Sequence, residues 1–267
     1  MMHVQGVTLT VRDLDRVARF YREVIGLAVL ETAPGRVVLG VGDAALVELL
    51  HRPGALEGDE REAGLFHTAF LLPERADLGR WLAHAAALGQ RLDGAADHLV
   101  SEAVYLRDPE GNGIEVYADR PRAEWRWTRT ADGPRVTMAN VALDRAGLLA
   151  LAGTRGSAAP AGTVVGHVHL QVGDTGAATR FYAGQLGLDV TLAWPEAVFL
   201  SSGGYHHHLA ANTWRSGGAG MRDPRRAGLE AVRLVRQGAV PGAAPGVTEV
   251  ADPWGTLLRF ETINREG

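Results

Sequence analysis

Residues 7–11 alternate apolar and polar side chains, as Val-Thr-Leu-Thr-Val, and the pattern then changes to a helical one. Strict alternation is typical of a strand with one buried face. Asp13 is a good helix N-cap, and apolar residues recur at helical spacing from there to Gly26, a residue type that favours the end of a helix. Short strands are predicted around residues 37–41 and 45–50. This part of the chain is therefore expected to form a strand, a helix and then three strands.

The same pattern returns 161 residues later along the chain. Residues 6–11 correspond to residues 167–172, and the Phe-Tyr pair at 20–21 corresponds to the pair at 181–182. The two stretches align without a gap over more than 30 residues. A match of this length indicates an internal duplication, which should be identified before any other feature of a fold.

A second type of unit follows each copy of the first. It opens with Ala-Gly-Leu and carries Asp-Pro-x-Gly near its end, at residues 63–65 and 108–111 in one copy and at 227–229 and 252–255 in the other. These landmarks divide the chain into four related units. We expect an α+β protein whose units span residues 4–52, 63–119, 165–213 and 227–263.

The second and fourth units differ in the segment between those landmarks. The second unit carries apolar residues at helical spacing between about 76 and 88, which predicts a helix. The fourth unit has Gln-Gly-Ala-Val-Pro-Gly at 237–242 instead, which predicts a loop. The resulting organisation is a first pair of units over 1–119, a linker over 120–163 that contains a short helix near 143–151, and a second pair over 164–267.

The composition is that of an ordinary globular protein. The chain has 267 residues, 46% of them hydrophobic, and a formal net charge of -4, which provides no basic surface for nucleic acid or an anionic membrane. It has no cysteine, so a transition-metal site would have to use histidines and carboxylates. Residues 1–10 do not resemble a secretory signal, and no apolar stretch is long enough to span a membrane. A cytoplasmic protein without membrane contact is expected.

Four such units in one chain resemble the vicinal-oxygen-chelate superfamily. Its units typically open with a strand and a helix that ends in Phe-Tyr and Gly-Leu, and its members include glyoxalase I, fosfomycin-resistance proteins, bleomycin-binding proteins and extradiol dioxygenases. The resemblance covers nearly the whole chain outside the linker. It implies four βαβββ units that form two curved mixed sheets, each enclosing a cleft. It leaves the function open, because function depends on the residues of the site.

The second unit contains a segment similar to the signature of the extradiol ring-cleaving dioxygenases. That signature has a His, then a Tyr, then Asp-Pro-x-Gly and a Glu, and this chain has them at matching spacing as His98, Tyr105, residues 108–111 and Glu115. Ala96 departs from the signature, which prefers Gly, Asn, Thr, Ile or Val at that position. This departure concerns a backbone preference. The resemblance implies that Glu115 is a metal ligand and that Tyr105 and His98 face the substrate.

In this superfamily the opening strand of a unit supplies a further ligand. The residues at that position are His67 in the second unit and His167 in the third, where the first unit has Gly6. Together with Glu115 they would form a two-His, one-carboxylate set, which suits a non-haem Fe(II) oxygenase because several positions on the metal remain open. Fe(II) is the expected cofactor, and Mn, Ni and Zn stay open as alternatives. His169 shares the strand parity of His167 and is expected to line the same face without binding the metal.

A run of three histidines at 206–208 precedes Leu209 and Ala210. Extradiol enzymes have a similar His-His-x-Leu-Ala segment whose second His is the acid–base residue, which implies this role for His207. Repeat parity agrees, because Leu209 corresponds to Glu48 at the same offset and His207 shares its face if the segment is a strand. Which of the three histidines faces the site remains open.

The resemblance implies an enzyme that inserts O2 into the ring of a small-molecule catechol. Another metal-dependent member of the superfamily, an isomerase or an antibiotic-modifying transferase, would need a similar ligand set but would not need Tyr105 and His207 together. A non-catalytic drug-binding resistance protein would need no metal ligands. The identity of the catechol and the oligomeric state, a homo-oligomer included, are not determined by these patterns.

The distribution of the ligands predicts which units share a cleft. The pairing of the third unit with the fourth, usual in extradiol enzymes, fails because the fourth unit has Ala231, Glu249 and Arg259 at the positions of His67, Tyr105 and Glu115. Pairing the first unit with the second fails because Gly6 replaces a ligand. We therefore predict that the second and third units form one cleft with the metal, and that the first and fourth units form a second cleft without one.

Overall fold

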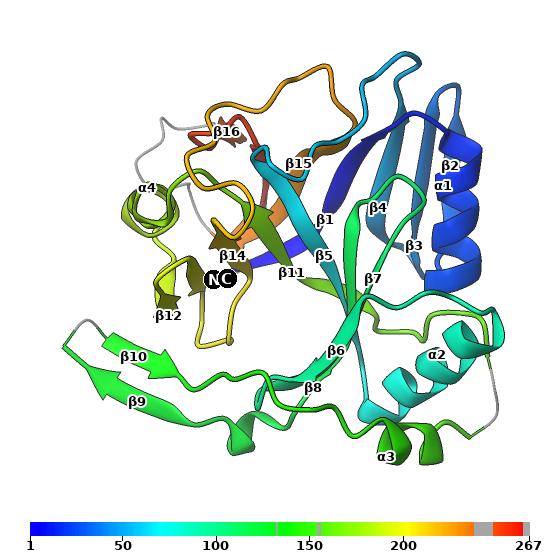
Figure 1. Cartoon of the computed structure of the whole chain (residues 1–267), viewed down its shortest axis with the longest axis horizontal. Coiled ribbons are helices and arrows are strands. Elements are labelled where there is room, and N and C mark those ends of the chain that lie inside the picture. Colours follow the sequence, from blue (N-terminus) through cyan, green and yellow to red (C-terminus); the bar gives the residue numbers. More distant parts are fainter. Residues whose placement is uncertain (132, 154–155, 238–247, 264–267) are drawn as a thin grey trace.

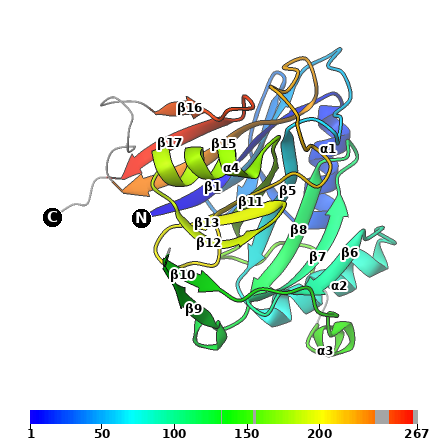
Figure 2. The ribbon, with the colours of Figure 1, turned by 60° about the vertical axis from the view of Figure 1, so that its left-hand side comes forward.

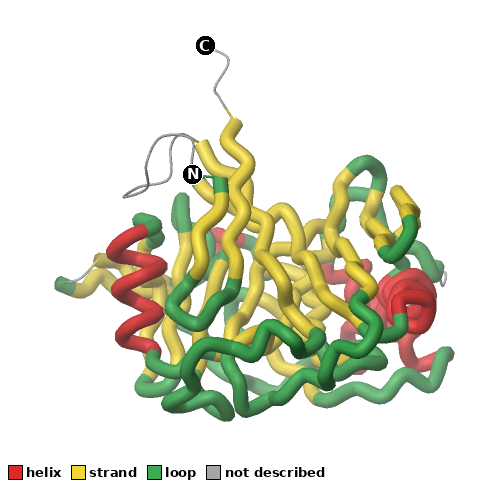
Figure 3. Tube along the Cα trace, turned by 90° about the horizontal axis from the view of Figure 1, so that it is seen from above, coloured by secondary structure: helices red, strands yellow, loops and turns green. Residues whose placement is uncertain are grey.

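The structure is a computed structural model that describes residues 1–131, 133–153, 156–237 and 248–263 (Figure 1). Two mixed sheets make up most of the molecule, which confirms the α+β class. Strands fill the middle of the molecule and the helices lie at its sides (Figure 3). None of the described helices has both the length and the apolar character that crossing a bilayer requires.

The first sheet has seven strands, all from the first and fourth units. Its central strand β1 is antiparallel to β15 and parallel to β4. Strands β3 and β4 cover the two short strands predicted around 37–41 and 45–50, which are confirmed. From edge to edge the order is β16 (Glu249–Ala251), β17 (Leu257–Ile263), β15 (Gly228–Gln237), β1 (Met2–Val11), β4 (Ala44–His51), β3 (Arg36–Val41) and β2 (Ala28–Ala33).

The second sheet has eight strands, all from the second and third units, and it is curved (Figure 2). Strands β11 and β5 are antiparallel neighbours at its centre. The prediction that the second unit pairs with the third, and the first with the fourth, is therefore confirmed. The order is β12 (Asp189–Trp194), β13 (Ala197–Ser201), β14 (Leu209–Asn212), β11 (Val164–Gln171), β5 (Gly64–Leu72), β8 (Gly113–Asp119), β7 (Ser101–Arg107) and β6 (Gly94–Asp97).

The helices of the first and third units each end in a π-helical turn. Helix α1 (Leu14–Phe20) is capped by the Asp13 side chain and continues as a π-helix (Tyr21–Ile25) up to Gly26, whose φ of 88° favours glycine. The third unit repeats this arrangement with α4 (Thr175–Thr179) and a π-helix (Arg180–Gln185).

The second unit carries the predicted long helix, and the linker carries the predicted short one. Helix α2 (Arg75–Ala87) matches the helix expected near 76–88, and α3 (Arg145–Ala150) matches the one expected near 143–151. The loop predicted at 237–242 in the fourth unit lies, apart from its first residue, outside the described residues.

The rest of the linker has its own structure. A 3-10 turn (Arg122–Glu124) leads into a hairpin of β9 (Trp127–Thr130) and β10 (Gly133–Val136), which projects from the body of the molecule (Figures 1 and 2). The division into 1–119, 120–163 and 164–267 stays a prediction. Each sheet combines one unit from residues 1–119 with one unit from residues 164–267.

The recurring Phe-Tyr and Asp-Pro-x-Gly motifs meet each other in the structure. The Tyr182 hydroxyl donates to Asp252 Oδ2 at 2.7 Å. The Tyr21 hydroxyl faces Asp108, and burial together with this carboxylate raises the pKa of Tyr21 well above its usual value. Each aspartate also accepts two backbone N–H groups from its own turn. Since each pair joins a helix of one sheet to a turn of the other, the repeated motifs hold the two sheets together.

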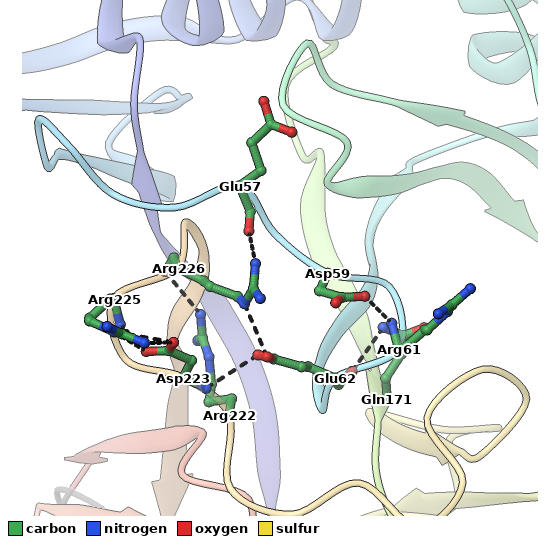
Figure 4. Close-up of polar contacts among 9 residues, drawn as sticks. All are labelled: Glu57, Asp59, Arg61, Glu62, Gln171, Arg222, Asp223, Arg225 and Arg226. Atoms are coloured by element: carbon green, nitrogen blue, oxygen red, sulfur yellow. Dashed lines mark hydrogen bonds and ion pairs between the residues drawn. The ribbon is translucent and has the colours of Figure 1, made fainter.

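A cluster of charged residues also joins the sheets, between the segment before β5 and the segment before β15 (Figure 4). Glu62 accepts hydrogen bonds from Arg226 Nε at 3.0 Å and from the Asp223 backbone N–H at 3.2 Å. Its own carbonyl oxygen accepts from Gln171 Nε2 at 3.4 Å. Asp223 and Arg226 precede β15 of the seven-stranded sheet. Glu62 precedes β5 and contacts Gln171 at the end of β11, both in the eight-stranded sheet, so the contacts of Glu62 join the two sheets.

Candidate metal centre

A row of paired residues crosses the eight-stranded sheet. His167 on β11 pairs with Ala69 on β5, and Ala69 pairs with Glu115 on β8. Paired residues project from the same face of a sheet, and His67 shares this face because it lies two positions before Ala69. Ala69 is fully buried and has only a methyl group, so the three longer side chains can converge beside it.

The three residues predicted as metal ligands come together. The distance from His67 Nε2 to Glu115 Oε2 is 3.0 Å, from His167 Nε2 to the same oxygen 3.2 Å, and between the two Nε2 atoms 3.4 Å. All three residues are buried, and they form a His-Glu-His metal-binding triad.

The spacing of these atoms fits a shared metal ion. Three atoms that each lie about 2.1 Å from one ion, with angles of about 90–110° at it, are about 3.0–3.4 Å from one another. The three observed distances fall in that range. Two imidazoles and one carboxylate are also a donor set that divalent transition metals accept.

The protonation states of His167 and Glu115 suit metal binding. Burial lowers the pKa of His167 to about 4, although the neighbouring carboxylate opposes the shift, so this imidazole is neutral near pH 7. Burial alone would raise the pKa of Glu115, but the two imidazoles beside it hold that pKa well below its usual value. A neutral imidazole and an ionised carboxylate are the forms that coordinate metals.

Tyr105 and His98, predicted to face the substrate, lie beside the triad. Tyr105 pairs with Glu115 across β7 and β8, and its hydroxyl lies 2.6 Å from His98 Nε2. His98 Nδ1 donates to the Ala139 carbonyl at 3.0 Å, so Nε2 of the neutral ring is the acceptor and Tyr105 is the donor. Burial, followed by the nearby Glu115 carboxylate, raises the pKa of Tyr105 well above 10. The hydroxyl therefore keeps its proton.

His207 is the histidine of the 206–208 run that lines the cavity at the triad. Its ring lies 4.1 Å from that of His167, measured between centroids. His206 points instead to Asp119, and His208 Nδ1 lies 3.1 Å from Ser201 Oγ. These histidines do not lie on a strand, as strand parity required, because the run precedes β14 and does not belong to it. Loop geometry, not strand alternation, therefore directs these three side chains.

A cavity of about 410 Å³ opens above the triad. His169 lines it, as expected, and its Nε2 bonds to the side-chain amide of Asn212 at 3.0 Å. The polar groups at the cavity are those of the triad, Tyr105 and the other histidines, together with Ser101 and Asn140, and no arginine is among its lining residues. Apolar side chains form much of the remaining wall: Phe66, Ala95, Ala96, Met138, Trp194, Phe199 and Trp214.

The corresponding positions of the other sheet hold different side chains. Gly6, Ala231 and Arg259 stand where the triad has His167, His67 and Glu115. The Arg233 guanidinium lies against Gly6 and donates to the Ala45 carbonyl at 3.0 Å. A Cβ at position 6 would clash with this guanidinium and with the Leu46 carbonyl oxygen.

Polar residues behind His207 were not predicted. Asp119 and Tyr117 lie on the same face of β8 as Glu115, at spacings of two, and they contact His206 and Tyr205 from the third unit. The alternation of polar side chains along Glu-Val-Tyr-Ala-Asp was the available signal. This alternation did not indicate which residues of the third unit would contact Tyr117 and Asp119.

The chain belongs to the Glyoxalase/Bleomycin resistance protein/Dioxygenase superfamily, whose family model matches residues 3–116 and 164–229. It is 41% identical over 242 residues to the catechol-2,3-dioxygenase of Bacillus subtilis (strain 168), a match that covers 87% of this chain and 82% of that protein. The resemblance to this superfamily is thereby confirmed.

Solved structures share the fold at low sequence identity. A candidate dioxygenase from Bacillus subtilis strain 168 superposes with a TM-score of 0.63 at 12% identity, covering 97% of this chain and 84% of that one. Glyoxalase I from Zea mays superposes with a TM-score of 0.57 at 16% identity, covering 97% of this chain and 92% of the other. At these identities the likeness concerns the fold.

Proposed function

We propose that this chain is an extradiol dioxygenase that opens the ring of a catechol with O2, using one Fe(II) held by His67, Glu115 and His167. The observation that carries the proposal is the buried triad beneath a cavity that Tyr105, His98 and His207 also line. The 41% identity to a catechol-2,3-dioxygenase supports the same reaction. An isomerase, a transferase or a drug-binding protein would not require this combination of groups.

When bound, Fe(II) would supply Lewis acidity toward the two adjacent catechol oxygens and a redox partner for O2. The protein residues orient the substrate and handle its protons. Tyr105 keeps its proton, which it donates to His98 Nε2 in this structure, and rotation of the hydroxyl about its C–O bond would let it donate to an ionised catechol oxygen instead. His207 lines the cavity as a neutral imidazole, because burial lowers its pKa well below 6.5. A neutral imidazole can accept a catechol proton and return it during ring opening.

The test of this proposal is metal content and O2 uptake. Protein purified without air and reconstituted with Fe(II) should hold about one iron per chain and consume O2 when catechol or a substituted catechol is added. Metal analysis and an oxygen electrode measure the two quantities, and Zn(II)-loaded protein is the control, because zinc has no accessible redox change. Iron-loaded protein that leaves a broad panel of catechols untouched would contradict the proposal and favour an isomerase or transferase.

The cavity wall predicts the range of catechols. The described residues that line the cavity include no arginine that could pair with a bound carboxylate, and the chain contains no lysine. Burying an unpaired charge is costly, so kcat/KM for 4-methylcatechol should exceed that for 3,4-dihydroxybenzoate by about 10-fold or more. Steady-state O2 uptake with both substrates measures the ratio.

Met138 offers a matched pair of variants for this prediction. Met138→Arg adds a cation to the cavity wall and should reduce the preference, whereas Met138→Leu keeps the wall apolar and should preserve it. Equal kcat/KM values for the two catechols in the wild-type protein would show that the wall does not select against charge.

A further inference from the structure

A line of three hydrogen-bonded side chains runs from the cavity through the interior. His207 Nδ1 lies 2.7 Å from His206 Nδ1, and His206 Nε2 lies 3.0 Å from Asp119 Oδ1. The His206 side chain is completely buried, and Asp119 ends β8, four residues after Glu115. The line therefore begins on the strand that carries the metal-binding carboxylate and ends on the ring that faces the cavity.

The chemistry of these groups fixes the direction of each hydrogen bond. A carboxylate only accepts, so the proton between Asp119 and His206 is on His206 Nε2. In the neutral ring Nδ1 of His206 then has a lone pair and accepts, so the proton between the two histidines is on His207 Nδ1. The Nε2 atom of His207 is left without a proton.

That free nitrogen faces the cavity. Within the described part of the chain, His207 Nε2 has no hydrogen-bond partner, and it is not among the nitrogen atoms sealed in the interior. His207 itself lines the cavity above the triad. The bare nitrogen is thus on the side where a bound catechol would have its proton.

We propose that Asp119 and His206 are positioning residues, which hold His207 in the Nδ1–H tautomer and so leave its Nε2 as the base that faces the substrate. The inference rests on the proposed function for what the base does. The tautomer itself follows from the contacts of a neutral His206 ring and does not depend on that function.

The surroundings of His206 are built to hold this arrangement. The Tyr205 hydroxyl lies 3.2 Å from Asp119 Oδ1 and donates to it, and the Tyr117 hydroxyl lies 2.9 Å from that of Tyr205. Burial is the main cause that raises the pKa of both tyrosines well above 10, so both keep their protons. A Cβ at Gly166 would clash with the Tyr117 hydroxyl, which is why glycine is needed there.

Aromatic rings pack against the ring of His206. The ring centroid of Tyr205 lies 4.0 Å from that of His206, and that of Trp125 lies 5.1 Å away. A neutral ring held between an acceptor at one nitrogen and a donor at the other has only one tautomer that satisfies both contacts.

Nitrogen NMR of the full chain labelled with 15N-histidine tests the tautomer directly. The protein is measured metal-free and loaded with Zn(II), a diamagnetic ion, and the resonances of the pair are assigned from their loss in His206→Phe and His207→Phe. In the wild type, His207 should be protonated at Nδ1 only and His206 at Nε2 only. A His207 proton on Nε2, or a doubly protonated His206, would overturn the proposal.

Three variants test the role of Asp119. In Asp119→Ala both histidines should populate a mixture of the two tautomers. In Asp119→Asn each should keep its single tautomer, because the amide oxygen can still accept from His206 and Tyr205. The exposed Asp15, changed to Asn, is the control that should leave the spectrum unaltered. The assignment would be refuted if the His207 tautomer were unchanged in Asp119→Ala, or if the population of its Nδ1–H tautomer fell equally in the alanine and asparagine variants. If Asp119→Ala fails to fold, His206→Phe removes the acceptor of the His207 Nδ1–H group directly and keeps a ring of similar shape, and loss of the His207 tautomer is then expected.

Kinetics separate positioning from a general loss of structure. In Asp119→Ala, kcat with catechol should fall by about 10–100-fold while KM changes little, and Asp119→Asn should restore most of kcat. A parallel rise in KM without a fall in kcat would contradict a role in the chemical step. Because the NMR result needs no turnover, it stands or falls separately from the dioxygenase assignment.

Discussion

Glu115→Ala is expected to weaken metal binding by more than about 100-fold, because the variant loses the carboxylate of the triad and, among the residues that the structure describes, no other carboxylate joins the two imidazoles in a ligand cluster. Equilibrium dialysis with Zn(II) or Fe(II) measures this loss. Thermal unfolding gives a second readout, since a metal at about 100 times its Kd stabilises the native protein by about 2.7 kcal/mol, and this gain should vanish in the variant.

Glu48→Ala is the matched control for that experiment. Glu48 is the repeat counterpart of Glu115 in its final strand, but it lies on β4 of the other sheet, where it accepts hydrogen bonds from Thr8 at 2.9 Å and from Arg36. The control variant should therefore bind metal as the wild type does. Full metal binding by Glu115→Ala would mean that the triad is not the metal site.

His207→Ala is expected to keep its metal and to lose a factor of about 10²–10⁴ in kcat, the usual contribution of an acid–base group. The ring lies beside His167 but is not part of the triad, so its removal leaves all three ligand atoms in place. His51→Ala is the control, because His51 is exposed, lies on β4 of the other sheet and is not among the residues that line the cavity. Metal analysis and O2 uptake on the same samples separate the two effects, and loss of metal equal to that of Glu115→Ala would disprove the acid–base role.

The fold and the pairing of units could be predicted because they depend on local periodicity and on a repeat. The strand at 7–11, the helix after Asp13 and the stop at Gly26 are each determined by neighbouring residues. The pairing followed from elimination, since only the second and third units carry complementary ligands. The triad was predicted from the resemblance to the superfamily, whose ligand positions fall on His67, Glu115 and His167, and the regular strands that carry these residues bring their side chains to one face.

The remaining parts of the site depend on contacts that periodicity does not encode. The histidines at 206–208 precede β14, so the alternation of side chains along a strand does not determine where they point, although His207 does line the cavity. Asp119 contacts His206 across 87 residues of sequence, and this contact depends on how β8 lies against a loop of another unit. Met138 and Asn140 reach the cavity from the linker, whose path is set by packing and not by a sequence pattern.

The Arg233 guanidinium beside Gly6 limits which substitutions this protein can accept during evolution. A histidine at position 6 could not be accommodated by one substitution, because the arginine and the β4 backbone already fill that space. A second triad would also require new side chains at Ala231 and Arg259, so several mutations would have to occur together before any benefit appeared. Selection acting on single steps cannot easily produce such a change. The seven-stranded sheet is constrained by stability, whereas the eight-stranded sheet must also keep the residues of the metal site. Homologous chains should therefore differ more from one another in their first and fourth units than in their second and third units.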